Sequence, residues 1–257
     1  MLRLTVLGSA DAFNSGGYLH SAYLLEGATG TLLLECGPSV LAGLKRQGLN
    51  GDSIDAVLVS HLHGDHFGGI PFLLLEYLFE SPRTRPLLVA GPAGTQQKVE
   101  QLYECYYSRD HLDRLGFDLR YVEIAPGDEL ELAGLEVGAF KVPHGAEPYC
   151  LGYRIEDPEG GSLLFSGDSA WTEDFVERSA GVDLFLCECC FMDKITDFHV
   201  SYHQLAANRE RLACERLLVT HLGSAVRQAA ELDAESLDAE SLDAELAVDG
   251  QVVELGA

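Results

Sequence analysis

The chain has 257 residues, of which 47% are hydrophobic, so a sizeable core can form. Asp and Glu number 41 against 17 Lys and Arg, which gives a net charge of −24. This charge repels polyanions and argues against long nucleic acids and anionic membrane surfaces as partners, which favours a small-molecule substrate. The first residues do not read as a secretory signal and no long apolar run is present, so we expect a cytoplasmic protein without a membrane span.

Short apolar runs alternate with helical stretches along the chain, which predicts an α/β fold. We expect strands at Leu2–Leu7, Ala22–Glu26, Thr31–Glu35, Ala56–Ser60, Leu87–Ala90, Leu119–Ile124, Leu135–Val142, Leu151–Ile155, Ser162–Phe165, Leu184–Cys187, Leu217–Thr220 and Val252–Leu255. We expect helices after Pro38 and at Ile70–Phe79, Thr95–Tyr107, Thr172–Ser179 and Tyr202–Leu212. No linker divides the chain, so residues 1–257 are predicted to form one domain.

A low-complexity stretch repeats AESLD at 234–243. Its leucines at 232, 237 and 242 recur every five residues, about 140° apart on a helix, and cannot form one apolar stripe. We interpret residues 232–246 as a solvated acidic surface excursion, with partner binding as the alternative.

Seven cysteines lack a CxxC pair, at positions 36, 105, 150, 187, 189, 190 and 214. This odd set does not resemble a disulfide framework, so most should be reduced and structural. Cys187, Cys189 and Cys190 suggest a soft-metal site, but the preceding Leu-Phe-Leu favours a buried strand instead.

The sharpest motif is His61-Leu62-His63-Gly64-Asp65-His66, directly after the apolar run Ala-Val-Leu-Val-Ser. Crowded histidines repel one another when protonated and need hydrogen-bond partners when buried, whereas a metal cation satisfies their nitrogens directly. The motif therefore predicts a metal site.

Three further candidate ligands each follow an apolar run: His144, Asp168 and His221. Ligands collect outside the carboxyl ends of strands in open α/β sheets, because loops there converge over a rigid scaffold. We expect these side chains to join the histidine motif.

HLHGDH, the later His144, Ser-Gly-Asp at 166–168 and Thr-His-Leu at 220–222 resemble the metallo-β-lactamase superfamily over nearly the whole chain. The resemblance implies a four-layer αβ/βα sandwich, in which two mixed β-sheets pack face to face between helices. It also implies two divalent ions. His61, His63 and His144 would hold one, Asp65, His66 and His221 the other, and Asp168 would bridge them.

Leu-Gly-Ser at 7–9 and Glu35-Cys36-Gly37, with the full ligand set, are similar to the branch that contains ribonuclease Z and small phosphodiesterases. The branch pairs a strand glutamate with a downstream histidine, which implies Glu188 and His199 here, with His203 as the alternative histidine. Family members commonly carry aspartate where Glu35 stands. No basic glycine-rich arm is present, so tRNA 3′-processing is a minor alternative.

These residues predict a hydrolase that uses a metal-bridged hydroxide, most readily on a small cyclic or nucleotide-like phosphodiester. Asp65 or Asp168 would orient the nucleophile, and His199 with Glu188 would protonate the leaving oxygen. Lactone, amide or thioester hydrolysis is the alternative, and a non-hydrolytic iron or metal-binding protein a minor one. Zinc is the expected metal, although manganese and iron suit the same ligands.

Substrate-shaping residues are less clearly marked in the sequence. The Gly-rich loop after the first strand offers Asp11, Asn14, Tyr18 and His20, of which His20 is the first to test. The apolar helix Ile70–Phe79 offers a surface for a possible homodimer.

Overall fold

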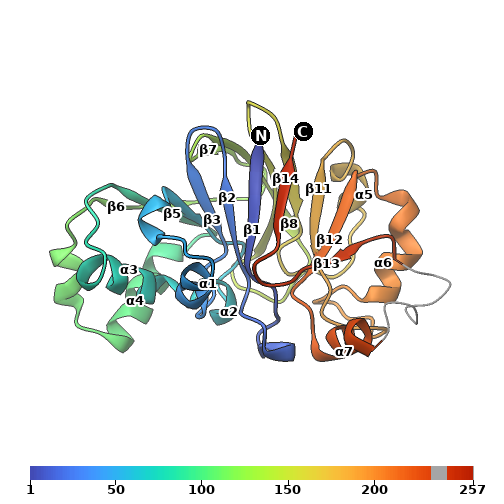
Figure 1. The fold of residues 1–257 in the computed structure, drawn as a ribbon, viewed down its shortest axis with the longest axis horizontal. Coiled ribbons are helices and arrows are strands. Elements are labelled where there is room, and N and C mark those ends of the chain that lie inside the picture. Colours follow the sequence, from blue (N-terminus) through green and yellow to red (C-terminus); the bar gives the residue numbers. More distant parts are fainter. Residues whose placement is uncertain (233–241, 257) are drawn as a thin grey trace.

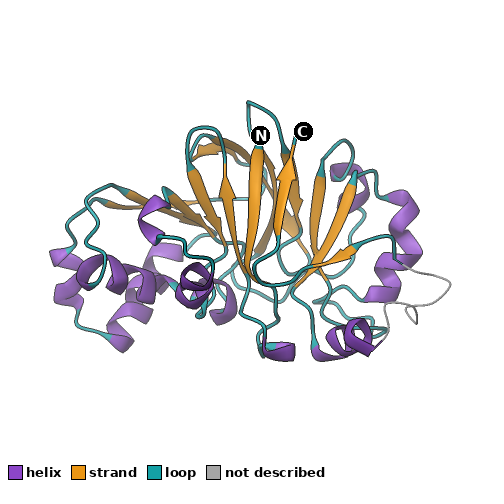
Figure 2. Ribbon diagram, in the orientation of Figure 1, coloured by secondary structure: helices purple, strands orange, loops and turns teal. Residues whose placement is uncertain are grey.

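A computed structural model describes residues 1–232 and 242–256 of the chain. Most of the AESLD repeat, at 233–241, therefore lies outside the described residues. Strands occupy the middle of the molecule and helices lie on both sides of them (Figures 1 and 2).

The first sheet has seven strands in the order β14-β1-β2-β3-β4-β5-β6. Neighbours from β14 to β3 are antiparallel, and those from β3 to β6 are parallel, so the sheet is mixed. The strands span β1 Leu2–Gly8, β2 Ala22–Glu26, β3 Thr31–Leu34, β4 Ala56–Leu58, β5 Leu87–Gly91, β6 Leu119–Glu123 and β14 Val252–Leu255.

The second sheet repeats this arrangement in the order β13-β12-β11-β10-β9-β8-β7. Pairing is antiparallel from β7 to β10 and parallel from β10 to β13. The strands span β7 Glu129–Leu132, β8 Leu135–Val142, β9 Cys150–Glu156, β10 Ser162–Phe165, β11 Leu184–Glu188, β12 Arg216–Thr220 and β13 Glu245–Leu246.

The two sheets face each other across a continuous core to which both contribute buried side chains. Tyr23 of β2 lies 5.8 Å from Phe165 of β10, measured between ring centroids. Its hydroxyl also hydrogen-bonds Thr220 of β12 at 2.7 Å, and Tyr153 donates to the Val59 carbonyl at 2.8 Å. These pairs fix the position of one sheet on the other through both apolar contact and satisfied buried hydroxyls.

Helices cover the outer faces of both sheets. Seven α-helices are present in the described residues, α1 Val40–Arg46, α2 Gly64–Phe67, α3 Ile70–Phe79, α4 Thr95–Tyr106, α5 Asp174–Arg178, α6 Tyr202–Asn208 and α7 Ser224–Leu232. Short 3-10 turns are η1 Ser15–Gly17, η2 Gly51–Ser53, η3 Arg109–Arg114 and η4 Arg209–Arg211. Residues of α1, α3 and α4 form an apolar cluster with the first sheet, and residues of α5 and α6 form one with the second. The predicted four-layer αβ/βα sandwich is confirmed.

Helix α3 buries most of its apolar side chains within its own chain. Ile70, Leu73, Leu74 and Tyr77 pack on the first sheet, whereas Phe79 is 56% exposed. Phe72, Leu75 and Leu78 are half-buried, so the apolar surface left for the predicted homodimer is limited to these side chains and Phe79. Among the described residues, no helix is long and apolar enough to cross a membrane.

The structure differs from the sequence prediction near the AESLD repeat. Glu245–Leu246 forms strand β13 beside β12, and Leu242 is buried against the cluster on the second sheet, with its N–H donating to the Tyr202 hydroxyl at 3.3 Å. The solvated excursion predicted for 232–246 is therefore wrong for 242–246. After the repeat the chain returns to the edge of the second sheet. Pairing with β12 stabilises residues 245–246, whose sequence has no strand pattern of its own.

Other elements also differ from the prediction. Strand β7 and helices α2 and α7 were not predicted, α5 covers 174–178 rather than 172–179, and α6 ends at Asn208 rather than Leu212. The alternating Glu-Leu-Glu-Leu of β7 occupies an edge of its sheet and pairs only with β8, so it carries charge where a central strand would be apolar.

Candidate metal centre

All seven predicted ligands lie at the ends of strands or in the turns that follow them. Strand β4 ends at Leu58, and the HLHGDH motif turns from it into α2, which begins at Gly64 and carries Asp65 and His66. His144 follows β8, Asp168 follows β10 and His221 follows β12. Strands β4, β10 and β12 belong to the parallel halves of their sheets. Strand β8 is antiparallel to β9, which is antiparallel to β10, so β8 runs in the same direction as β10 and its carboxyl end points to the same edge. In Figure 1 this edge carries α2, opposite the two chain termini.

His61, His63 and His144 form the first group. Their ligand nitrogens lie within 4.8 Å of one another, and Nδ1 of His63 is 3.2 Å from Nε2 of His144. His61 is fully buried whereas His63 is exposed, so the group opens from the core to the surface.

Asp65, His66, Asp168 and His221 form the second group. Nε2 of His66 lies 3.2 Å from Asp65 Oδ2 and 3.3 Å from Asp168 Oδ2. Nε2 of His221 lies 3.3 Å and 3.5 Å from the same two oxygens.

Asp168 joins the two groups. Its Oδ2 is within 3.9 Å of Nε2 of both His61 and His144 in the first group. The same oxygen contacts both histidines of the second group, so one carboxylate oxygen has four imidazole nitrogens within 3.9 Å. This is the position that the resemblance implies for a bridging ligand.

The charges in this cluster are arranged as a cation would require. Burial lowers the pKa of His61 well below its usual range. Burial also acts to lower the pKa of His66 and His221, but the nearby carboxylates of Asp168 and Asp65 together hold both pKa values well above the usual range, with Glu35 adding to the effect on His66. Burial acts to raise the pKa of Asp168, and His221 and His66 nevertheless hold it well below its usual range. Without metal, protonated imidazoles balance the carboxylates, and a divalent ion would supply the same positive charge.

The donor set fits a metal ion. Nε2 of His61 is buried without a hydrogen-bond partner among the described residues. Leaving such a group unpaired costs about 1–3 kcal/mol, and coordination removes that cost. Imidazole nitrogens and carboxylate oxygens are ligands of zinc, manganese and iron. His61, His63, His144 and the Asp168 carboxylate can therefore hold one ion, and Asp65, His66, His221 and the same carboxylate a second.

Groups outside the cluster orient several of these histidines. Nδ1 of His61 lies 2.9 Å from Ser60 Oγ, and Nδ1 of His144 lies 2.8 Å from the Phe198 carbonyl. The fully buried Glu35 accepts a hydrogen bond from the Ser60 N–H at 2.8 Å, and its Oε2 is 3.3 Å from Nδ1 of His66. Glu35 adopts a left-handed φ of 60°. Neither Ser60 nor the Phe198 carbonyl carried a signal in the sequence.

The structure brings His199 to Glu188. Nδ1 of His199 is 2.8 Å from Glu188 Oε1 and 4.0 Å from Asp168 Oδ2. The buried glutamate also accepts from the backbone N–H groups of residues 169 and 190. Burial raises the pKa of Glu188, and although burial acts to lower the pKa of His199, contact with Glu188 raises it. His203 is exposed on α6, with its ring 6.2 Å from Tyr202.

The loop after β1 is tied down by buried polar contacts. Asp11 accepts hydrogen bonds from the N–H and hydroxyl of Ser15, so it builds the loop itself. Tyr18 lies over the guanidinium of the buried Arg227, 3.8 Å from the ring centroid, and Arg227 donates to Ser9. Arg227 anchors this loop to α7, a role that the sequence did not reveal because α7 itself was not predicted.

His20 is held at the border of the second group. Its Nδ1 lies 3.3 Å from Asn14 Nδ2 and 3.2 Å from Ser39 Oγ. A Cβ on Gly37 would lie 2.6 Å from His20 Cβ and 2.5 Å from the Asp65 carbonyl, so both residues pack against this glycine. Burial lowers the pKa of His20. Its location beside Asp65 suits a substrate contact.

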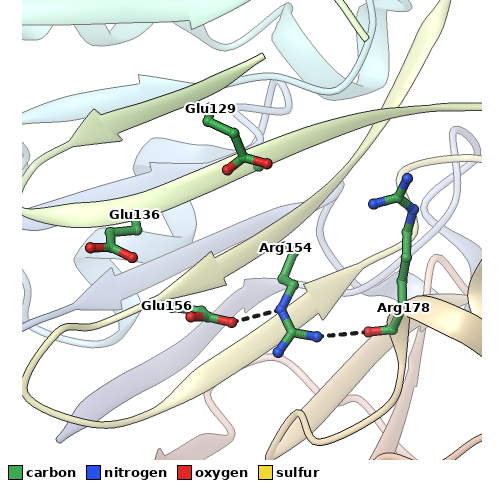
Figure 3. A pocket seen from close by; sticks show the side chains of 6 residues that line it. Glu129, Glu136, Arg154, Glu156 and Arg178 are labelled. Carbon is green, nitrogen blue, oxygen red and sulfur yellow. Dashed lines mark hydrogen bonds and ion pairs between the residues drawn. The ribbon is translucent and has the colours of Figure 1, made fainter. Parts of the chain in front are cut away.

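A separate depression of about 250 Å³ lies on the outer face of β7, β8 and β9. Arg154 donates to Glu156 at 2.6 Å and to the Arg178 carbonyl at 2.9 Å (Figure 3). The Arg178 guanidinium lies 4.4 Å from the ring centroid of Phe140. No residue of the metal cluster lines this depression, which is an ion-paired part of the sheet surface.

Comparison with known proteins agrees with the fold. The model of the family described as anti-Pycsar protein Apyc1 matches residues 2–238. Ribonuclease Z of Agathobacter rectalis is 26% identical, covering 89% of this chain and 90% of its own. The uncharacterised protein ML1173 of Mycobacterium leprae is 32% identical, covering 86% and 78%.

Solved structures share the architecture. YhfI of Bacillus subtilis, described as a metallo-β-lactamase fold protein, has a TM-score of 0.76 at 22% identity, covering 99% of this chain and 100% of its own. The short form of human tRNase Z gives 0.77 at 21%, with coverage of 99% and 100%. A diphosphatase of the PhnP family gives 0.76 at 18%, with coverage of 100% and 99%. The chain has the metallo-β-lactamase fold and belongs to the family of the anti-Pycsar protein Apyc1.

Proposed function

We propose that this chain is a hydrolase of small phosphodiesters, cyclic or nucleotide-like, with two divalent metal ions, zinc by default. Its relatives act on phosphorus esters or anhydrides by their names, ribonuclease Z and the PhnP-family diphosphatase. Two ions held by the seven ligands would activate a water molecule as the nucleophile and neutralise charge that develops on the substrate. The net charge of −24 favours a small substrate over a long nucleic acid.

The observation that carries the proposal is the Glu188–His199 pair. Hydrolysis of a phosphodiester needs a proton for the leaving oxygen. Nδ1 of His199 is engaged by Glu188 at 2.8 Å, which leaves Nε2 to hold that proton. The side chain of His199 is 20% exposed and lies beside Asp168, so it can reach a substrate at the cluster. Glu188 supports the imidazolium form, because the buried carboxylate stabilises the positive charge.

The other residues of the chain bind and orient. Asp65 and Asp168 place oxygen atoms on both sides of the His66 and His221 nitrogens, where a nucleophilic water can be aligned by hydrogen bonding. His20, beside Asp65, is placed to contact a non-bridging oxygen or the leaving group. The two carboxylates thus supply acceptors for the water molecule, and His20 supplies a donor for the substrate.

The test is turnover of bis-p-nitrophenyl phosphate against a panel of lactones and thioesters, with metal-reconstituted protein. We expect the phosphodiester to react, and His199→Ala and Glu188→Gln to lower kcat by about 10²–10⁴-fold, the usual contribution of a general acid, while metal content stays unchanged. His203→Ala is the matched control, because it removes an exposed histidine four residues away. Reaction of the carbonyl compounds alone would refute the proposed substrate class.

A further inference from the structure

Cys190 and His221 lie side by side where two parallel strands end. Glu188 of β11 pairs in register with Thr220 of β12, and the N–H of residue 189 donates to the Thr220 carbonyl at 2.8 Å. A Cβ on Gly223 would lie 2.1 Å from the Cys190 carbonyl oxygen, so the turn after His221 is pressed against Cys190. The relative position of these two side chains is therefore fixed by the sheet.

His221 presents its two nitrogens to different surroundings. Nε2 faces Asp65 and Asp168 at 3.3 and 3.5 Å. Nδ1 is buried and has no hydrogen-bond partner among the described residues. A neutral imidazole that offers Nε2 to a metal carries its proton on Nδ1, and that N–H needs an acceptor to fix the ring. The residue also has a left-handed φ of 51°, which a non-glycine residue adopts only when its surroundings hold it there.

Three of the other histidines in the cluster have an oxygen beside the nitrogen that faces away from Asp168. Ser60 Oγ hydrogen-bonds Nδ1 of His61 at 2.9 Å and the Phe198 carbonyl does so for His144 at 2.8 Å, whereas Glu35 Oε2 lies 3.3 Å from Nδ1 of His66 as an ion-pair contact without a hydrogen bond. His221 has Cys190 instead, because the thiol sulfur lies within 4.8 Å of a ring nitrogen of His221.

We propose that Cys190 is a positioning residue for His221, with the thiol sulfur as the acceptor for the Nδ1–H group. This inference rests on the proposed metal centre, and it assigns a role to a cysteine that would otherwise be one more buried thiol. Sulfur is a weak acceptor compared with the oxygens that serve the other histidines. His221 is consequently held less firmly than His61 and His144, whose Nδ1 atoms face oxygens, and we expect loss of this weak contact to weaken the binding of the ion that His221 helps to hold.

Zinc titration of the metal-stripped protein against a chromophoric chelator tests this role. We expect Cys190→Ala to weaken one of the two zinc-binding steps by about 10–100-fold, as is usual for loss of a group that orients a ligand, and to leave the other unchanged. Cys190→Ser keeps an acceptor and should restore most of the affinity. Cys214→Ala is the matched control, because that thiol is similarly buried, at 7% against 9% exposed, but contacts none of the metal histidines.

A double variant separates positioning from packing. If Cys190 acts through His221, Cys190→Ala lowers zinc affinity no further once His221→Ala is present. Equal losses of zinc affinity in Cys190→Ala and Cys214→Ala would overturn the inference, as would additive losses in the double variant. Circular dichroism of the metal-free variants identifies any variant that fails to fold. Zinc binding without phosphodiester turnover refutes only the proposed reaction, whereas a wild-type protein that binds no zinc refutes both proposals.

Discussion

Glu35 accepts one hydrogen bond and lies beside a second nitrogen that would be a donor when His66 binds metal, which makes Glu35→Gln an informative perturbation. Its Oε1 accepts from the Ser60 N–H at 2.8 Å, and its Oε2 lies 3.3 Å from Nδ1 of His66. When His66 binds a metal through Nε2, Nδ1 carries a proton, so both oxygens face donors. Glutamine has the same shape but a single acceptor oxygen. Whichever way the amide is turned, its NH₂ group faces either the Ser60 N–H or the His66 Nδ1–H, and that buried donor has no acceptor.

The free-energy cost of Glu35→Gln follows from the one donor that loses its acceptor. Leaving one buried donor unsatisfied costs about 1–3 kcal/mol, which corresponds to about 5- to 150-fold in an equilibrium constant. We expect this loss in zinc affinity if the amide oxygen stays with Ser60, because the unpaired donor is then on a metal ligand. If the oxygen turns to His66 instead, the loss falls on the stability of the metal-free protein.

The assay combines chelator-competition titration with thermal unfolding, at a mildly alkaline pH where protons compete little for imidazole. Glu129→Gln is the control, because it makes the same chemical change on an exposed residue of β7. Wild-type zinc affinity together with wild-type thermal stability for Glu35→Gln would show that the carboxylate does not serve both donors, and the reasoning would be wrong.

Three further predictions concern the same cluster. Asp168→Ala should lower metal content and activity together, because its Oδ2 contacts both ligand groups, and elemental analysis with full metal occupancy would remove it from the site. The metal-free protein should lose stability as the pH rises above the unfolded histidine pKa of about 6.5 and through the raised pKa values of His66 and His221. The reason is that these two histidines lose the protons that stabilise the folded state. The metal-loaded protein should not show this loss. Thermal unfolding across pH checks this, and parallel curves with and without metal would contradict it. Gly37→Ala should lower both melting temperature and metal content, since its Cβ would lie 2.5 Å from a backbone oxygen of the metal motif, while Gly64→Ala, with nothing within 4 Å of the new Cβ, should resemble wild type in both measurements.

The sequence pattern was sufficient for the α/β class and for the list of residues that meet at the cluster, and the four-layer arrangement was implied by the resemblance to the metallo-β-lactamase superfamily. The apolar runs mark most of the strands because a strand buried between a second sheet and a layer of helices must be apolar on both faces. The HLHGDH motif and the later His144, Asp168 and His221 are recognisable because each follows such a run, and a strand end is a predictable place. The positions of these strands and ligands can be predicted because the apolar run and the residue after it are neighbours in the sequence.

Contacts between distant segments were decided only by the tertiary structure. Whether His199 or His203 meets Glu188 depends on the path of the loop from β11 to α6, for which no periodicity exists. The pairing of Cys190 with His221 requires β11 and β12 to lie in register, and burial of Leu242 requires the chain after the acidic repeat to return to the edge beside β12. Such contacts gain their free energy when remote segments pack together, so the local sequence has no pattern that announces them.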